Sequence, residues 1–171
     1  MINRIAVFIA GVLILAGCNL GGDVSGGNSG SGGVPAGDSA QVVRVIDGDT
    51  IEVNLNGENQ RVRYIGMNTP ERDEVCYQEA TDANRNLVEG QTVTLVRDTS
   101  DTDRFDRLLR YVYVGNTFVN WELVEQGYAE AVLYNPDDEF FSMFNQMEIV
   151  AATAGRGCHP TGIFNDGNAE R

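Results

Sequence analysis

Apolar and polar residues alternate over two short stretches near the middle of the chain. In residues 50–55 every second side chain is apolar, the pattern of a half-buried strand. The dipeptide Asn56-Gly57 follows, which favours a tight hairpin turn, and residues 60–65 return as the partner strand. The pattern therefore predicts a β-hairpin whose two outer ends lie side by side.

Helical spacing of apolar residues recurs three times after this hairpin. The first two segments are followed by Gly90 and Gly127, and glycine commonly ends helices. The third segment has apolar side chains at helical spacing: Phe140, Phe144, Met147, Ala151 and Ala154. Its aromatic residues favour a core position over a binding platform. The predicted helices span residues 78–88, 119–126 and 138–154, and further strands span residues 92–97 and 108–114, with a polar loop at 98–106.

An unbroken apolar run, residues 5–17, follows a single arginine near the beginning of the chain. It is too short to span a bilayer as a mature helix and is typical of a secretory signal peptide, which we place at residues 1–17. The Leu-Ala-Gly before Cys18 is similar to a bacterial lipoprotein cleavage box. This favours lipidation of Cys18 over an uncleaved anchor or a chance cysteine. We therefore expect an exported protein, lipid-anchored to the cell envelope and facing outside the cytoplasm.

Glycine, serine and asparagine dominate residues 18–38. Such a segment cannot bury enough apolar surface to fold, so we predict a flexible linker after the lipidated cysteine. Residues 39–165 are long enough for a single domain with its own core. The polar tail, residues 166–171, is expected to fray.

Two cysteines remain once Cys18 is set aside, Cys76 and Cys158. An even number in an exported chain predicts a disulfide, and two free thiols are the less favoured alternative in an oxidising compartment. A zinc site has little support, because His159 is the only histidine and there is no Cys-x-x-Cys pair.

The formal net charge of the chain is −13, and its cationic side chains are all arginine. Most nucleic-acid-binding proteins are basic, because contacts to phosphate dominate their affinity. An acidic protein that binds nucleic acid needs a local positive site, a bound cation, or high ambient salt that screens repulsion. The composition also fits adaptation to a saline habitat.

Polar side chains gather where the two outer ends of the hairpin meet. Asp47 and Asp49 precede its first strand, Arg63 lies in its second strand, and Asn68 and Glu71 follow it. Arg63 faces away from the side of its apolar neighbours in the strand, so it need not be a core residue. Two carboxylates, an amide, a glutamate and an arginine together suit a hard cation beside a phosphate.

Three motifs resemble the staphylococcal nuclease family: Asp-Gly-Asp-Thr at 47–50, Arg-x4-Asn-Thr-Pro-Glu at 63–71, and Asp-Arg-Phe-Asp-Arg at 103–107. In order and spacing the similarity extends from about Val42 to about Gly157. The resemblance implies a β-rich α+β domain, a five-stranded OB-fold barrel with three helices. It also implies phosphodiesterase activity.

The resemblance implies a metal site made of oxygen ligands. Asp49, with a free carboxylate, is the expected principal ligand, Asp47 a second one directly or through water, and Thr69 a ligand through its backbone carbonyl. Asn68 stands where the family usually has aspartate, so we expect weaker affinity for the metal; alternatively, Asn68 merely turns the loop. An all-oxygen site of this kind favours Ca²⁺.

The resemblance also implies the catalytic residues. Glu71 matches the general base that activates water, although a surface glutamate is the alternative. Arg63 and Arg107 match two arginines that contact the scissile phosphate, where planar guanidinium groups stabilise the transition state.

The resemblance also places Arg104 and Phe105 at positions that contact the nucleotide, and Tyr134 within a residue of a third such position. Phe105 has a stacking face but lacks the family's hydroxyl. Arg110 has no counterpart in the family and is interpreted as a solvated strand position.

The leading hypothesis is a monomeric, calcium-dependent endonuclease of DNA and RNA, acting at the cell surface and preferring single strands. The resemblance implies cleavage of the bond between the 5′ oxygen and phosphorus, leaving 3′-phosphates. A non-catalytic OB-type module that binds nucleic acid or another ligand would explain the acidic surface and Asn68, but not the joint presence of Glu71, Arg63 and Arg107. A surface structural protein whose acidic face binds calcium is a third possibility.

Overall fold

The computed structural model describes residues 33–165. The predicted signal peptide, Cys18, most of the predicted linker and the tail lie outside the described residues. β1 (Asp38–Val45) is not among the strands predicted from the pattern. It begins at Asp38, and Val34 already packs against the barrel.

The alternating stretches form the predicted hairpin, β2 (Thr50–Leu55) and β3 (Glu58–Tyr64). Asn56 and Gly57 have φ values of 54° and 92°, both in the left-handed region that a two-residue hairpin turn requires. The turn residues therefore fix the register, and apolar side chains of both strands point into the core.

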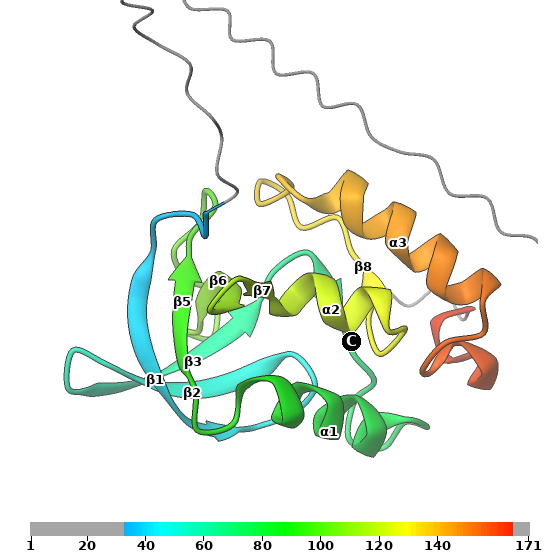
Figure 1. Ribbon diagram of the computed structural model, residues 1–171, viewed down its shortest axis with the longest axis horizontal. Helices are drawn as coiled ribbons and strands as arrows, with labels where there is room; N and C mark the ends of the chain where they lie inside the picture. Colours follow the sequence, from blue (N-terminus) through cyan, green and yellow to red (C-terminus); the bar gives the residue numbers. More distant parts are fainter. Residues whose placement is uncertain (1–32, 166–171) are drawn as a thin grey trace, which may run out of the picture. The chain divides into compact units, whose positions relative to one another are not determined.

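A closed barrel follows from the pairing of the remaining strands. The sheet order is β3-β2-β1-β5-β6-β7, and a parallel pairing of β3 with β6 closes it into a five-stranded barrel with the short β7 at its edge (Figure 1). The other strands are β4 (Met67–Asn68), β5 (Thr92–Val96), β6 (Leu108–Val114), β7 (Thr117–Phe118) and β8 (Glu130–Ala131). The predicted fold, an OB-type barrel with three helices in one domain, is confirmed.

The three helices are α1 (Tyr77–Val88), α2 (Val119–Glu125) and α3 (Phe141–Thr153), followed by the short 3-10 helices η1 (His159–Thr161) and η2 (Ile163–Asn165). Buried Asn120 of α2 accepts from the backbone N–H of Val112 (2.9 Å) and donates to the carbonyl of Ile65 (3.1 Å). This side chain fixes α2 on the barrel. No helix among residues 33–165 is long and apolar enough to cross a membrane.

α3 begins at Phe141, three residues later than the prediction. The backbone N–H of Glu139, before the helix, donates to the carboxylate of Asp98 in the loop before β6 (3.2 Å). Phe140 and Phe144 nevertheless pack on Tyr111, with ring centroids 4.6 and 6.3 Å apart, as the predicted core positions require. Ala154, at the C-terminal end of the helix, is exposed.

Arg110 is buried in β6, with 4% exposure, so the interpretation as a solvated position was wrong. Its guanidinium group donates to the carboxylate of Asp101 (2.6 Å) and to the carbonyls of Asp101 (2.9 Å) and Leu109 (2.8 Å). A charged side chain is tolerated inside the strand because these acceptors replace water. The contact also fixes the beginning of the loop between β5 and β6.

Candidate active site

The turn between β1 and β2 presents Asp49, whose carboxylate accepts from several donors. One oxygen accepts from the backbone N–H and the hydroxyl of Thr69, both at 3.0 Å. The other accepts from the hydroxyl of Thr50 (3.1 Å) and lies 3.2 Å from Nε of Arg63. The expectation of a free carboxylate was therefore wrong. Asp49 joins the turn to the loop that follows β3.

Close packing at Gly48 supports the same arrangement. A Cβ at this position would lie 2.6 Å from the hydroxyl oxygen of Thr69, so the turn can approach the loop only because residue 48 is glycine. From the other side, buried Asn84 of α1 donates to the carbonyl of Asp47 (2.8 Å) and accepts from the hydroxyl of Tyr64 (2.9 Å). Helix α1 thus fixes the turn on the barrel.

Asp47 lies beside Asp49 at the beginning of this turn, and its carboxylate accepts from the backbone N–H of Asp49 (3.1 Å). Burial, together with the neighbouring Asp49 carboxylate, raises the pKa of Asp47 to about 6. A bound cation would reduce the repulsion between these two carboxylates.

Arg63 is buried, with 3% exposure, contrary to the expectation from its strand position. One terminal nitrogen donates to the carbonyls of Tyr64 (2.5 Å) and Met67 (3.0 Å), and the other donates to the amide oxygen of Asn68. The guanidinium group therefore fixes the loop after β3. Arg63 also lines the cleft described below.

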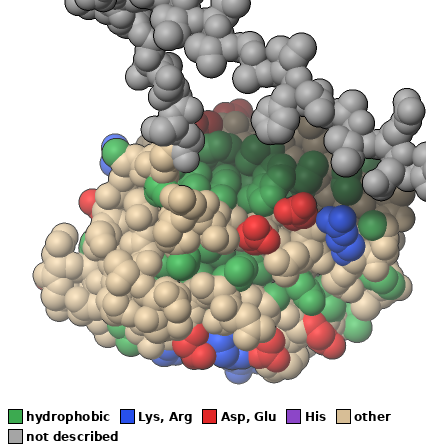
Figure 2. Space-filling model, in the orientation of Figure 1, with side chains coloured by type: hydrophobic (Ala, Val, Ile, Leu, Met, Phe, Trp, Pro, Cys, Tyr) green, Lys and Arg blue, Asp and Glu red, His purple; other side chains and the backbone are tan. Residues whose placement is uncertain are grey.

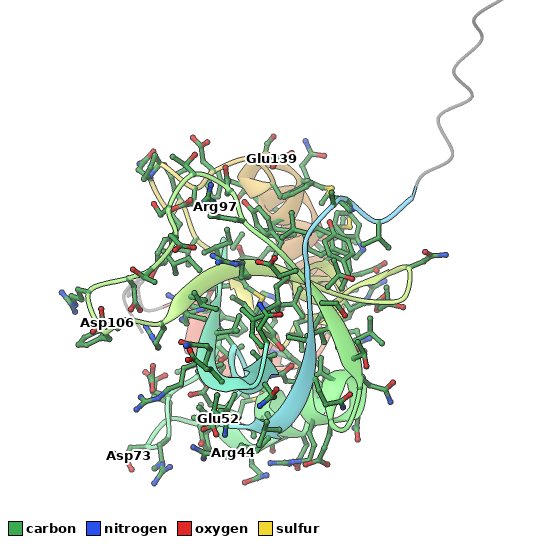
Figure 3. All side chains as sticks on the ribbon, turned by 90° about the vertical axis from the view of Figure 1, so that its left-hand side faces the viewer. Arg44, Glu52, Asp73, Arg97, Asp106 and Glu139 are labelled. Carbon is green, nitrogen blue, oxygen red and sulfur yellow. A yellow bond between two sulfur atoms is a disulfide. The ribbon has the colours of Figure 1, made fainter. Side chains whose placement is uncertain are left out.

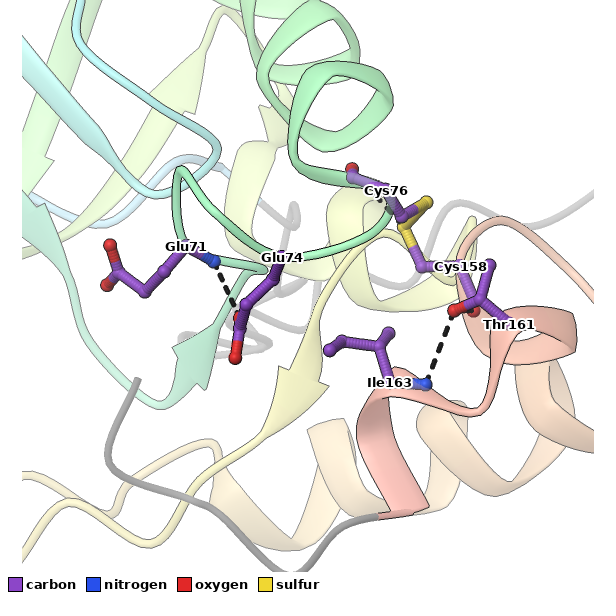
Figure 4. Close-up of a disulfide and its surroundings, with 6 residues drawn as sticks. All are labelled: Glu71, Glu74, Cys76, Cys158, Thr161 and Ile163. Carbon is purple, nitrogen blue, oxygen red and sulfur yellow. Dashed lines mark hydrogen bonds between the residues drawn. A yellow bond between two sulfur atoms is a disulfide. The ribbon is translucent and has the colours of Figure 1, made fainter.

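Glu71 follows this loop and is exposed. Its backbone N–H donates to the carboxylate of Glu74 (2.8 Å), and the N–H of Glu74 donates to the carbonyl of Glu71 (2.8 Å) (Figure 4). Partial burial and the Asp49 carboxylate raise the pKa of Glu71, whereas Arg63 and Arg107 act in the opposite direction. Glu71 is thus within electrostatic range of all three of these predicted site residues.

The second predicted arginine, Arg107, lies in a tight loop organised by Asp103. One carboxylate oxygen of Asp103 accepts from the backbone N–H groups of Phe105 (2.8 Å) and Arg107 (3.0 Å), and the other accepts from Nε of Arg107 (2.7 Å). Although partial burial opposes the shift, these hydrogen bonds lower the pKa of Asp103. The loop presents Phe105, 62% exposed, with the guanidinium carbons of Arg104 and Arg107 4.8 and 5.5 Å from the ring centroid.

One open cleft of about 590 Å³ brings these elements together. One wall is the loop with Asp103, Arg104, Phe105 and Arg107, and the opposite wall is residues 132–135. The cleft is lined by Arg63, Asn68, Asp103, Arg104, Phe105, Arg107, Val132, Leu133, Tyr134 and Asn135. Six of the predicted site residues therefore share one cleft, and Asp49 adjoins it through its contact with Arg63.

Sequence reasoning did not find three residues that shape the site, Asp103, Asn84 and Asp137. Asp103 had a usable signal, because it stands at the start of the Asp-Arg-Phe-Asp-Arg motif and aspartate commonly accepts from backbone N–H groups two residues on. Asn84 and Asp137 make contacts with residues distant in sequence, which no local pattern indicates.

The predicted metal ligands carry only oxygen donors, the kind that a hard cation prefers. Among residues 33–165, no group of three or more His, Cys, Asp or Glu side chains could hold a metal ion. The available set is instead the carboxylates of Asp47 and Asp49, the amide oxygen of Asn68 and the carbonyl of Thr69. Oxygen ligands with a partly neutral set suit calcium better than transition metals.

The disulfide predicted between Cys76 and Cys158 is confirmed, with a Cα–Cα distance of 5.7 Å. It joins the beginning of α1, directly after the Glu71 loop, to the turn before η1 (Figure 4).

Comparison with known proteins agrees with the fold and the motifs. Residues 61–158 match the family model described as "Staphylococcal nuclease homologue". The thermonuclease of Staphylococcus hyicus is 35% identical over 114 residues, which cover 63% of this chain and 68% of that protein. The thermonuclease of Staphylococcus intermedius is 34% identical over 118 residues, or 66% of this chain and 70% of the relative. Endonuclease YncB of Bacillus subtilis (strain 168) is 38% identical over 109 residues, which cover 59% of this chain and 52% of that protein. The chain therefore belongs to the staphylococcal nuclease family.

Proposed function

We propose that this protein is a calcium-dependent nuclease that hydrolyses phosphodiester bonds in DNA and RNA and prefers single strands. Membership of the nuclease family supports the reaction class. The observation that carries the proposal is the convergence of three arginines and two aromatic rings on one cleft. Asp49 contacts Arg63 beside this cleft, and Glu71 is within electrostatic range of Arg63 and Arg107. The open cleft has one exposed ring, which suits stacking of an unpaired base.

The proposed chemistry uses the side chains in different ways. Asp47, Asp49, Asn68 and the carbonyl of Thr69 would hold the cation, which when bound stabilises charge that develops on phosphate. Glu71 accepts a proton from the attacking water, and its raised pKa makes it a better base than an ordinary carboxylate.

The two arginines differ in availability. Arg63 is committed to protein acceptors and presents a fixed positive charge, whereas the side chain of Arg107 pairs with one carboxylate, that of Asp103, and is 23% exposed. Arg107 therefore binds the phosphate directly, and Arg63 stabilises its charge without rearrangement. Cleavage of the bond to the 5′ oxygen, with a 3′-phosphate product, is the outcome that we propose.

We also propose that the protein is exported and anchored to the cell envelope through a lipid on Cys18, with the glycine-rich residues before Val34 as a linker. The support is the apolar run at residues 5–17 and the Leu-Ala-Gly-Cys sequence that ends it. A monomeric domain on such a tether acts on nucleic acid outside the cytoplasm.

Hydrolysis of a single-stranded oligonucleotide is expected to stop on addition of a chelator and to return with Ca²⁺. Glu71→Gln is expected to lower kcat by about 100-fold or more, because the general base is lost. The measurement is the initial rate of product formation, followed by analysis of the product ends. Glu79→Gln, an exposed glutamate on α1, is the matched control and should retain the wild-type rate. A rate indifferent to chelator and to Glu71→Gln would refute the proposal.

A non-catalytic binding module is the second candidate, and one observation favours it. The Asp49 carboxylate already accepts from Thr50 and Thr69 and contacts Arg63, so a cation must compete with these partners. In the same assay, calcium-dependent binding of the oligonucleotide without any product would select this alternative.

Asn68→Asp is expected to raise the affinity for Ca²⁺ by about tenfold, because a charged ligand replaces a neutral one beside two carboxylates. Asn68 is 2% exposed, and its amide oxygen already accepts from Arg63, which would also neutralise the new charge. Isothermal titration with Ca²⁺ measures the change. Asn116→Asp, in an exposed turn after β6, adds the same charge elsewhere and should leave the affinity unchanged. Equal affinities for the wild type and Asn68→Asp would remove residue 68 from the metal site.

A further inference from the structure

Asp137 is a buried carboxylate, 1% exposed, that joins the two walls of the cleft. It lies in the segment after the wall formed by residues 132–135. One of its oxygens accepts from the backbone N–H groups of Thr99 (2.9 Å) and Ser100 (2.6 Å), at the start of the loop that forms the other wall. Its own N–H donates to the carbonyl of Tyr134 (2.5 Å), which lines the cleft.

A second contact crosses between the same segments. The carboxylate of Asp98 accepts from the backbone N–H of Glu139 (3.2 Å) and from the hydroxyl of Tyr111 (3.1 Å). Figure 3 shows Arg97, at the start of the loop, and Glu139 on the upper part of the molecule, with Asp106, at the far end of the loop, projecting to one side. The loop is therefore held at its base while Phe105 and its neighbours project from it.

We propose that Asp137 is a positioning residue that sets the width of the cleft and thereby the affinity for the nucleotide. This inference rests on the proposed function. Thr99 and Ser100 precede Arg104 and Phe105 in one loop, so a shift at the base displaces the ring of Phe105 and the side chain of Arg104 relative to Leu133 and Tyr134. Arg107 directly precedes β6, which is paired with β3, so its position does not depend on the base of the loop. Leu133 is half exposed (50%) and so presents an apolar side chain to a base on Phe105.

The metal and the water-activating groups do not depend on this connection. Asp49 and Arg63 are fixed by Thr69, Asn68 and the barrel strands, and Glu71 by Glu74. A wider cleft therefore weakens binding of the nucleotide more than it slows the chemical step. This separation distinguishes positioning from a general loss of structure.

The test compares Asp137→Ala with Asp137→Asn in the full-length protein. Alanine removes the acceptor of two backbone N–H groups, whereas asparagine retains one side-chain oxygen that can accept both. We expect Asp137→Ala to raise KM for a single-stranded trinucleotide by about tenfold with kcat changed by less than about threefold, and Asp137→Asn to restore KM to within about threefold of the wild type. Asp138→Ala removes the same charge one residue away, at an exposed position, and is the matched control.

Equilibrium binding of the dye-labelled trinucleotide in chelator gives a second readout that does not require turnover. Its Kd should rise with KM in Asp137→Ala. If Asp137→Ala does not fold, Asp98→Ala interrupts the other crossing contact and should change KM and Kd in the same direction. Unchanged KM and Kd in the folded variant, or equal losses in Asp137→Ala and Asp138→Ala, would overturn the inference. A wild-type protein that binds but does not hydrolyse would instead refute the proposed function.

Discussion

Replacement of Arg63 by lysine is expected to abolish hydrolysis and also to lower the free energy of unfolding by about 3–5 kcal/mol, the range for breaking a buried ion pair. Lysine has a single terminal nitrogen. It cannot contact Asp49 and at the same time donate to the carbonyls of Tyr64 and Met67 and to Asn68. Urea unfolding followed by Trp121 fluorescence measures the stability, and the initial rate measures the activity.

Arg107→Lys is the matched control for this expectation. Arg107 is partly exposed and contacts a single carboxylate, so its replacement should lower kcat by about 100-fold with a change in stability of less than about 1 kcal/mol. Equal effects of the two substitutions on stability would show that the buried network around Arg63 does not contribute to the fold as we describe it.

Loss of the disulfide is expected to be the largest change in stability without any change in the catalytic side chains. The bridge joins residues 82 positions apart, and the chain-entropy model gives about 4–5 kcal/mol for a loop of this size. The double variant Cys76→Ser/Cys158→Ser should therefore unfold at a much lower urea concentration than the wild type. Its activity at low temperature should also fall, because Cys76 fixes the end of the loop that begins at Glu71.

Reductant provides the control. It should lower the stability of the wild type to that of the double variant and leave the double variant unchanged. If the double variant and the wild type unfold at the same urea concentration, the bridge does not stabilise the domain.

Local patterns predicted four of the five barrel strands, β2, β3, β5 and β6, and missed β1. Asn56 and Gly57 have the backbone conformation that their residue types favour, and the strand from Leu108 to Val114 has the predicted bounds. The start of α3 was not predictable from the local pattern. The carboxylate of Asp137, just before the predicted helix, accepts from the backbone N–H groups of Thr99 and Ser100, which are distant in sequence. The hypothesis of a nuclease-type hydrolase is confirmed at the level of the family.

The sequence predicted which residues form the candidate site but not their burial or their hydrogen bonds. Motif spacing identified Arg63, Asn68 and Arg107, which share the cleft. The hydrogen bonds of these residues depend on tertiary packing. Arg63 and Arg110 both lie in strands, and each is buried because its guanidinium group donates to backbone carbonyls and contacts a carboxylate. A charged side chain can be buried only where such acceptors surround it, and the residues next to it in the sequence do not show whether they will.

The surface explains how an acidic chain can have such a site. Figure 2 shows charged side chains scattered over one face, with carboxylates beside arginines at its lower edge. Ion pairs of this kind, such as Arg44 with Glu52, leave little net attraction for a long polyanion. Positive charge is instead concentrated in the cleft, at Arg63, Arg104 and Arg107.

The parallel pairing of β3 with β6 has a kinetic consequence. It aligns Arg63 of β3 with Leu109 of β6, and β6 begins directly after Arg107. The two arginines therefore come together only when the barrel closes. Contacts between such distant parts of a chain form slowly during folding. Partly folded molecules, which contain the hairpin but not this pairing, therefore lack the two-arginine arrangement. For the proposed nuclease, enzymatic turnover during refolding thus reports completion of the barrel, which spectroscopic signals from individual strands do not.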